Sequence, residues 1–228
     1  MEIRLESLPA GAARAAGTTI VIDVFRAFTC AAVAFARGAR RIVMVDGIER
    51  ALALKAAGAG ELCMGERRGR KPEGFDFPNS PALLDEADLA GRSLIQATSN
   101  GTAGLWAAAG AERLYAAALV NASATARALR RQAPALVTLV AAGQYGRTRT
   151  DEDELCALHL RALLRGRKPD AGALEALLAS LLAEPPAELI ARGDYHPRDR
   201  AIAMQTDRHD IAIRVRRDGA LLIAEPEP

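Results

Sequence analysis

The stretch TTIVIDVFRAFTC, from Thr18 to Cys30, decides the fold of this chain. Its first residues form a short apolar run that ends at Asp23, and the small residues after Arg26 are numerous enough to begin a helix. A short run rich in Ile and Val predicts a buried strand, and a strand followed directly by a helix is the repeating unit of α/β proteins. Ligands of open α/β sheets bind beyond the carboxyl ends of the strands, so we expect Asp23 to point into the functional site.

The same alternation continues along most of the chain. Further strands are predicted over residues 41–46, 61–66, 93–98, 113–119 and 135–143, with helices over residues 29–39, 48–60, 100–111 and 121–132. Two more helices are predicted over residues 150–166 and 171–184, followed by a hairpin over residues 210–225 that turns at Asp218-Gly219. We therefore predict one α/β domain, residues 1–228, with three α/β/α layers around a largely parallel or mixed sheet, and with C-terminal helices and a closing hairpin packed onto that sheet.

The composition suits a protein of enzyme size. Half of the 228 residues are hydrophobic, and the net charge is only +2, from 30 basic and 28 acidic residues. This balance gives no general reason to expect a nucleic acid or a membrane as a partner. The three cysteines are far apart and no long apolar segment occurs, so we expect a reduced, soluble protein of the cytoplasm.

Two segments that follow predicted strands combine opposite charges. Asp23 precedes Arg26 and Thr29, and its carboxylate could serve a ligand, cap the next helix or pair with Arg26. Glu66 precedes Arg67 and three further cations in GERRGRK, which could bind a multiply anionic substrate or form a solvated loop. The residues alone leave these interpretations open.

Two later segments could complete a site for an anion and a metal. The turn TSNGT, residues 98–102, offers backbone N–H groups and hydroxyls before a predicted helix, although Asn-Gly also occurs in ordinary turns. The segment TDEDEL places Glu152 and Asp153 within four consecutive carboxylates at a helix start. A helix dipole accounts for some of this acidity, but adjacent carboxylates repel one another, and Mg²⁺ would relieve that repulsion.

Several other phosphoryl-transfer motifs are missing from the sequence. No cysteine is followed six residues later by arginine, and Asp23 does not begin an Asp-x-Asp motif. The glycine-rich loops of nucleotide-binding proteins do not occur, and the three histidines lack the spacing of a zinc site.

Five blocks, taken together and in order, resemble the 2-phosphosulfolactate phosphatase family. They are VIDVFRAFT (21–29), GERRGRKPEGFDFPNSP (65–81), TSNGT (98–102), LVNASATARAL (119–129) and DEDELCA (151–157). The resemblance implies an α/β, Mg²⁺-dependent phosphatase that releases phosphate from 2-phosphosulfolactate to leave sulfolactate, a step associated with coenzyme M synthesis. It also implies a homodimer.

The resemblance also suggests site residues. It implies that Asp23 helps to hold the metal or acts in phosphate release, and that Arg26 and Thr29 bind an anionic group of the substrate. The other matched positions are Glu66, Arg67, Asp76, Asn79, Ser80, Asn100, Gly101, Thr102, Glu152 and Asp153. From charge we assign Mg²⁺ to Asp23, Glu66, Glu152 and Asp153, and catalysis to Asp23, Glu152 and Asp153. We assign substrate binding to Arg67, Asn79, Ser80, Asn100, Gly101 and Thr102, beside Arg26 and Thr29.

Two alternative functions stay open at this point. The first is the same chemistry on another small phosphorylated acid, because Phe28 and Cys30 stand where threonines are usual in the family. Whether Phe28 lines the substrate pocket separates these two phosphatases. The second alternative is an anion-binding protein without turnover, in which Asp23, Glu152 and Asp153 are only helix-end or salt-bridge residues.

Overall fold

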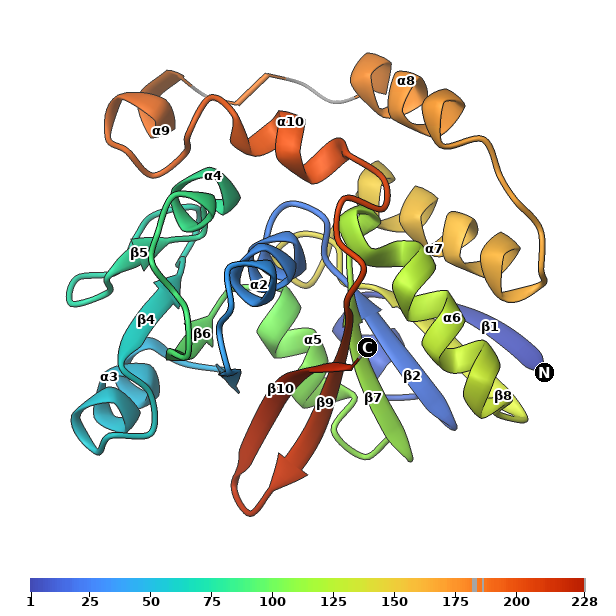
Figure 1. Cartoon of the computed structure of the whole chain (residues 1–228), viewed down its shortest axis with the longest axis horizontal. Helices are drawn as coiled ribbons and strands as arrows, with labels where there is room; N and C mark the ends of the chain where they lie inside the picture. Colours follow the sequence, from blue (N-terminus) through green and yellow to red (C-terminus); the bar gives the residue numbers. More distant parts are fainter. Residues whose placement is uncertain (182–183, 186, 228) are drawn as a thin grey trace.

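The structure, a computed structural model, describes residues 1–181, 184–185 and 187–227 (Figure 1). The strands are β1 (Glu2–Ser7), β2 (Thr18–Ile22), β3 (Arg41–Val45), β4 (Leu62–Gly65), β5 (Phe77–Pro78), β6 (Ser93–Ala97), β7 (Arg113–Ala117), β8 (Leu136–Ala141), β9 (Ala212–Asp218) and β10 (Leu221–Glu227). The helices are α1 (Leu8–Ala12), α2 (Ala27–Ala36), α3 (Ile48–Ala56), α4 (Pro81–Asp85), α5 (Gly101–Ala107), α6 (Ala122–Gln132), α7 (Asp151–Leu164), α8 (Ala171–Leu181), α9 (Ala187–Ala191) and α10 (Asp199–Met204), with a 3-10 turn at Leu119–Asn121. Within these described ranges, no helix combines the length and apolar character that a membrane crossing requires.

One sheet of ten strands organises the molecule, in the order β1-β8-β2-β7-β9-β10-β3-β6-β4-β5. All residues of β2 and β6 are buried. Because successive side chains of a strand point to opposite faces, this burial requires cover on both faces of the sheet. The predicted α/β class is therefore confirmed, and all six strands expected between residues 18 and 143 are present.

The sheet is mixed and consists of two parallel sets. The strands β1, β8, β2 and β7 run parallel to one another, and so do β3, β6, β4 and β5. The hairpin of β9 and β10 joins the sets, with β9 antiparallel to β7 and β10 antiparallel to β3. The expectation that the hairpin packs onto the sheet was wrong, because its backbone completes the centre of the sheet (Figure 1). Its two connecting residues are Gly219 and Ala220, one position later than predicted.

Sheet twist explains how the two sets can share one functional end. Three antiparallel pairings separate β7 from β3, so the sets would run in opposite directions in a flat sheet. Neighbouring strands rotate by about 20–25° on average, so the six steps from β2 to β4 accumulate roughly 120–150°. The carboxyl ends of β2 and β4 therefore reach the same end of the molecule, the end crossed by α9 and α10 in Figure 1.

Candidate active site

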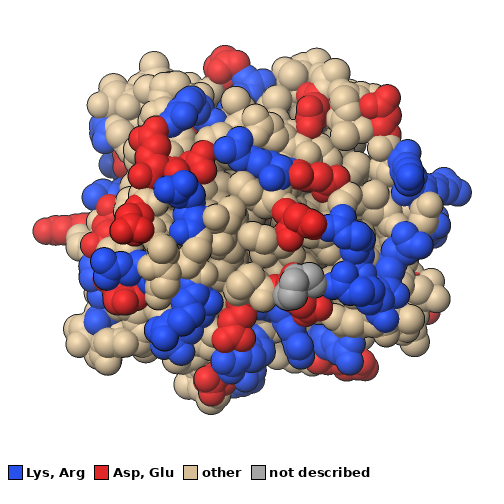
Figure 2. Space-filling view, viewed as in Figure 1, with Lys and Arg blue, Asp and Glu red and all other residues tan. Residues whose placement is uncertain are grey.

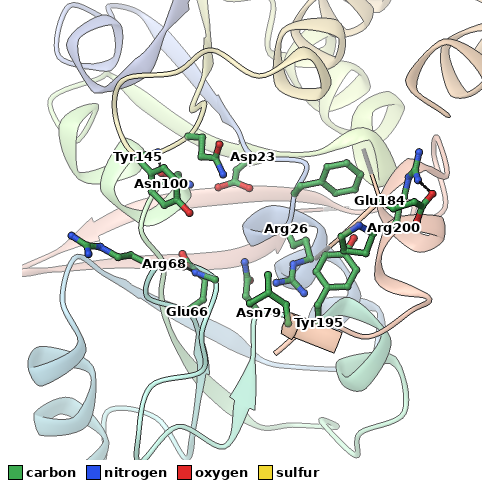
Figure 3. Close-up of a pocket in the computed structure, with 15 residues that line it drawn as sticks. Asp23, Arg26, Glu66, Arg68, Asn79, Asn100, Tyr145, Glu184, Tyr195 and Arg200 are labelled. Atoms are coloured by element: carbon green, nitrogen blue, oxygen red, sulfur yellow. Dashed lines mark hydrogen bonds and ion pairs between the residues drawn. The ribbon is translucent and has the colours of Figure 1, made fainter. Parts of the chain in front are cut away.

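The converging strand ends place two carboxylates in one cavity of about 290 Å³. Asp23 directly follows β2, and Glu66 directly follows β4. Arg26, Asn79 and Asn100, all predicted to bind substrate, line the same cavity. Figure 3 shows these side chains pointing inward from separate elements. The fold thus brings together five of the residues predicted for the site, from both parallel sets.

Asp23 is a buried carboxylate with few compensating contacts. Only 4% of the residue is exposed, and Oδ1 accepts a hydrogen bond from the backbone N–H of Ala27 at 3.0 Å. Burial raises the pKa of Asp23 to about 7, and the negative charges of Glu66 and Glu152 add to the effect. Asp23 therefore exchanges a proton near neutral pH, where a general base works best.

Asp153 fixes the backbone beside Asp23. Its Oδ1 accepts from Val24 N at 2.8 Å and its Oδ2 accepts from Gly143 N at 2.9 Å. These bonds join the loops that follow β2 and β8 to the first turn of α7. Burial raises the pKa of Asp153 well above its usual range, and the charges of Asp23 and Glu152 raise it further. Both oxygens of Asp153 are thus already engaged by the protein.

Glu152, the neighbour of Asp153 on α7, is also buried, with 8% of the residue exposed. Burial raises the pKa of its carboxyl, and the charge of Asp151 contributes to the increase. Glu152 and Asp153 are not among the described residues that line the cavity, but both act electrostatically on Asp23 and its surroundings. The structure therefore places the acidic start of α7 behind the cavity wall.

Glu66 is held by the loops on either side of it. Its Oε2 accepts from Gly69 N at 2.7 Å, and its Oε1 accepts from Ser99 N at 2.6 Å. The preceding Gly65 has φ +144°, and a Cβ at this position would lie 1.9 Å from Ala97 O. Glycine is therefore required at the end of β4 to carry Glu66 into the cavity.

Arg26 is held by an acid that lies far along the sequence. Its Nη1 donates to Asp199 Oδ2 at 2.7 Å, with the two side chains 7% and 0% exposed. Asp199 Oδ1 accepts from Ser80 Oγ at 2.6 Å, and the Arg26 guanidinium stacks on the ring of Tyr195 at 4.3 Å. Ser80 therefore contacts the partner of Arg26 and caps the start of α4, and it is not among the described lining residues.

Thr29 and Thr102, both predicted to bind substrate, form hydrogen bonds with the backbone near the cavity. Thr29 is fully buried, and its hydroxyl donates to Val24 O at 2.8 Å. Thr102 is also fully buried, and its Oγ1 accepts from Thr98 N at 2.9 Å and donates to Thr98 O at 2.9 Å. Neither is among the cavity residues that the structure describes. Their contacts stabilise the loop and helix start that carry the lining residues.

Two further predicted residues also lie off the lining. A Cβ on Gly101 would lie 2.7 Å from Ala27 Cβ and 2.8 Å from Asp23 Oδ2, so the close approach of α5 to Asp23 requires glycine. Arg67 is exposed, and its backbone pairs with that of Arg70. The cation of that loop that lines the cavity is Arg68.

Sequence reasoning missed much of the opposite wall. The other lining residues that bear polar groups include Arg68, Gln144, Tyr145, Glu184, Tyr195 and Arg200. Arg68 belongs to the charge run after β4, which was a usable signal. Tyr195 and Arg200 lie more than 100 residues beyond Glu66 in the chain, in segments where no motif singled them out.

Phe28 does not line the cavity. It is fully buried and belongs to the main hydrophobic core, as does Cys30. The aromatic residues of the described lining are Phe25, Tyr145 and Tyr195. Phe28 and Cys30, the two departures from the family pattern, therefore pack in the core around α2. Neither adds a side chain to the described lining of the cavity.

The donors around the cavity meet what Mg²⁺ requires of a protein. Across residues 1–181, 184–185 and 187–227, no three His, Cys, Asp or Glu side chains come together as a metal cage. Mg²⁺ does not need one, because it commonly takes one or two carboxylates together with substrate oxygens and waters. Asn79 Oδ1 is buried and has no hydrogen-bond partner among the described residues, and Asn79 lines the cavity with Asp23 and Glu66. Two carboxylates and an unpaired amide oxygen fit a hard cation.

Comparison with known proteins identifies the family. Residues 4–215 match the family model described as 2-phosphosulpholactate phosphatase. The chain belongs to the 2-phosphosulfolactate phosphatase family. As a member of this phosphatase family, it is a phosphoric monoester hydrolase.

Individual relatives of the 2-phosphosulfolactate phosphatase family agree with this result. A protein of Bacillus subtilis named probable 2-phosphosulfolactate phosphatase is 34% identical over 173 residues, which cover 74% of each chain. Proteins of the same name from Gloeobacter violaceus and Thermus thermophilus are 35% and 36% identical over 184 and 153 residues. Those matches cover 78% and 67% of this chain, and 76% and 64% of the relatives.

Proposed function

We propose that this protein hydrolyses 2-phosphosulfolactate to sulfolactate and inorganic phosphate, and that it depends on Mg²⁺. The observation that carries the proposal is the meeting of Asp23, Glu66 and Arg26 in one cavity at the strand ends. A phosphatase needs a group that accepts a proton from water, and it needs positive charge for the phosphate oxygens. Asp23 can accept the proton. The positive charge comes from the arginines of the cavity and from the cation that its carboxylates would hold.

Asp23 and Glu66 would hold the metal, with the Asn79 side-chain oxygen as a further donor. When bound, Mg²⁺ neutralises phosphate oxygens and helps to activate water. The negative charges of Glu66 and Glu152 act on Asp23, and such a concentration of acids favours a cation there. Asp153 keeps the backbone beside Asp23 in place through its two hydrogen bonds.

The chain's own residues divide the remaining work. The Asp23 carboxylate accepts the proton of the attacking water as the new P–O bond forms. The bond between phosphorus and the substrate's C2 oxygen breaks, and that oxygen takes a proton from solvent to give the hydroxyl of sulfolactate, while Asp23 returns its proton to solvent. Arg26 is fixed by Asp199 and Tyr195, so it can stabilise developing negative charge without moving.

The cavity walls also suit a substrate with several anionic groups. Arg26 and Arg68 approach from different elements, and arginine matches phosphate, carboxylate and sulfonate oxygens. Phe28 stays in the core, so the feature that would have favoured a different phosphorylated acid is missing from the described lining. These observations support the sulfonate-bearing substrate.

The test is phosphate release from 2-phosphosulfolactate and from 2-phospholactate, which carries the same ester but no sulfonate. Each is assayed with Mg²⁺ and with EDTA. We expect phosphate release that depends on Mg²⁺ and that is faster from 2-phosphosulfolactate than from 2-phospholactate. Equal rates on both substrates would support the alternative of another phosphorylated acid, and no release from either would support a binding protein. A homodimer in the cytoplasm is part of the proposal, and a monomer in sedimentation at working concentration would refute the dimer.

A further inference from the structure

A second cavity, of about 330 Å³, lies between α6, α7 and the start of α8. It shares no lining residue with the first cavity among the residues that the structure describes. Four of its lining residues are basic: Arg127, Arg130, Arg167 and Lys168. In Figure 2, Lys and Arg side chains gather on the side of the molecule where α6 lies in Figure 1. The cavity is therefore a concave part of a basic surface.

Helix dipoles explain part of this charge. Arg130 lies in the last turn of α6, and Arg167 and Lys168 follow the end of α7. Cations at helix C-termini interact favourably with the partial negative charge of the helix end. This effect requires neither a cavity nor a buried polar group, so it does not account for the next residue.

His159 lines this cavity from α7 and is buried, with 6% of the residue exposed. Its Nε2 is buried and has no hydrogen-bond partner in the described part of the chain. Buried polar groups nearly always have a partner, from the protein, from an ordered water or from a bound molecule. An oxygen of a ligand in the cavity would supply one, because a neutral imidazole donates from the nitrogen that carries the proton.

The acids at this cavity, Asp207 in its described lining and Asp210 beside the lining residue Arg127, are already engaged. Asp207 accepts from Ser123 N and from Ser123 Oγ, both at 2.6 Å. Arg127 forms an ion pair with Asp210. Arg130, Arg167 and Lys168 are in none of the ion pairs found among the described residues. Even with Asp207 in the described lining, the cavity therefore carries a net positive charge that favours an anion.

We propose that this second cavity binds a small anion that carries phosphate groups, with Arg130, Arg167 and Lys168 around its charge and His159 Nε2 donating to one of its oxygens. The volume fits a compact molecule, and the apolar residues Leu163 and Pro169 leave room for a short carbon skeleton. The site lies on the same helix as Glu152 and Asp153 but contains no part of the phosphatase cavity. The proposal does not rest on the proposed reaction.

The test follows the imidazole resonances of the intact protein by NMR during titration with inorganic phosphate and with pyrophosphate, at constant pH and ionic strength. The chain has only three histidines, and His196→Gln and His209→Gln assign the remaining resonance to His159. No histidine is among the described residues of the phosphatase cavity, so a His159 shift reports on the second cavity. We expect a saturable His159 shift, with pyrophosphate binding more tightly than phosphate.

The double variant Arg130→Ala and Arg167→Ala should weaken binding at least about tenfold, because each change removes a charge-assisted contact. Arg165→Ala is the matched control, because Arg165 is exposed beside the same helix end but does not line the cavity. The anion concentration at the midpoint of the His159 titration should be the same in Arg165→Ala as in the unchanged protein. The proposal is wrong if neither anion moves the His159 resonance, or if the double variant titrates like the Arg165→Ala control.

Discussion

Asp199→Asn should destabilise the protein far more than its conservative nature suggests. Asp199 is fully buried and accepts hydrogen bonds from Arg26 Nη1, Ser80 Oγ, Ala82 N and His196 N, at 2.6 to 3.0 Å. The amide keeps the volume but removes the charge, and its NH₂ group faces donors where an oxygen stood. Breaking a buried ion pair costs about 3–5 kcal/mol, because the remaining charge is left without compensation. For a chain of this size that corresponds to a fall in Tm of about 6–20 °C.

The assay is thermal unfolding, with Glu225→Gln as the control. Glu225 pairs with Arg216 at 3.0 Å, but these side chains are 41% and 44% exposed, so losing the pair should cost less than about 1 kcal/mol. Combining Asp199→Asn with Arg26→Met should cost less than the sum of the single changes, because the double variant leaves no buried charge. If Asp199→Asn melts within 2 °C or so of the Glu225→Gln control, the claim that Asp199 compensates Arg26 is refuted.

The other predictions concern the carboxylates and one close contact. In EDTA, Tm should fall as pH rises from about 5 to 8, because the pKa of Asp23 is raised to about 7 and the folded state binds the extra proton only below that value. Asp23→Asn should reduce this dependence, to which Glu152 and Asp153 also contribute, and should lower phosphate release by about 10²-fold or more; an unchanged dependence of Tm on pH would contradict the assignment. Glu152→Gln should lower Mg²⁺-dependent turnover without loss of stability. Asp153→Asn should lower turnover too, and it should also cost about 1–3 kcal/mol of unfolding free energy in denaturant, because one backbone N–H loses its acceptor. Wild-type turnover in the double variant would exclude both residues from the site. Gly101→Ala should cost about 1–3 kcal/mol through overpacking, whereas Gly110→Ala, where an added Cβ meets nothing within 4 Å, should be nearly neutral in the same melts.

The sequence predicted elements well where burial is complete. The apolar runs of β2 and β6 cannot be exposed, and the helices between the strands follow from their length and composition. β1 was not predicted, because its residues EIRLES mix charged and apolar side chains on a partly exposed edge of the sheet. The central place of the hairpin was also missed, because it depends on pairing between segments about 100 residues or more apart, which local patterns do not encode.

The candidate site was predictable in part for the same reason. Asp23 and Glu66 could be recognised because each is a carboxylate directly after an apolar run. The partner of Arg26 could not, because Asp199 lies 173 residues further on and is an ordinary acid at a helix start. Local sequence also could not distinguish residues that line the cavity from residues such as Thr29, whose hydroxyl donates a hydrogen bond to the backbone.

The central hairpin has a consequence for synthesis on the ribosome. β9 and β10 are made after every other strand, and β7 and β3 are joined only through them. A nascent chain therefore carries two incomplete half-sheets, each with an unpaired apolar edge of the kind that chaperones protect. Asp23 belongs to one half and Glu66 to the other, so translation that stops before residue 212 yields a chain in which no strand pairing joins the halves that carry the two cavity carboxylates.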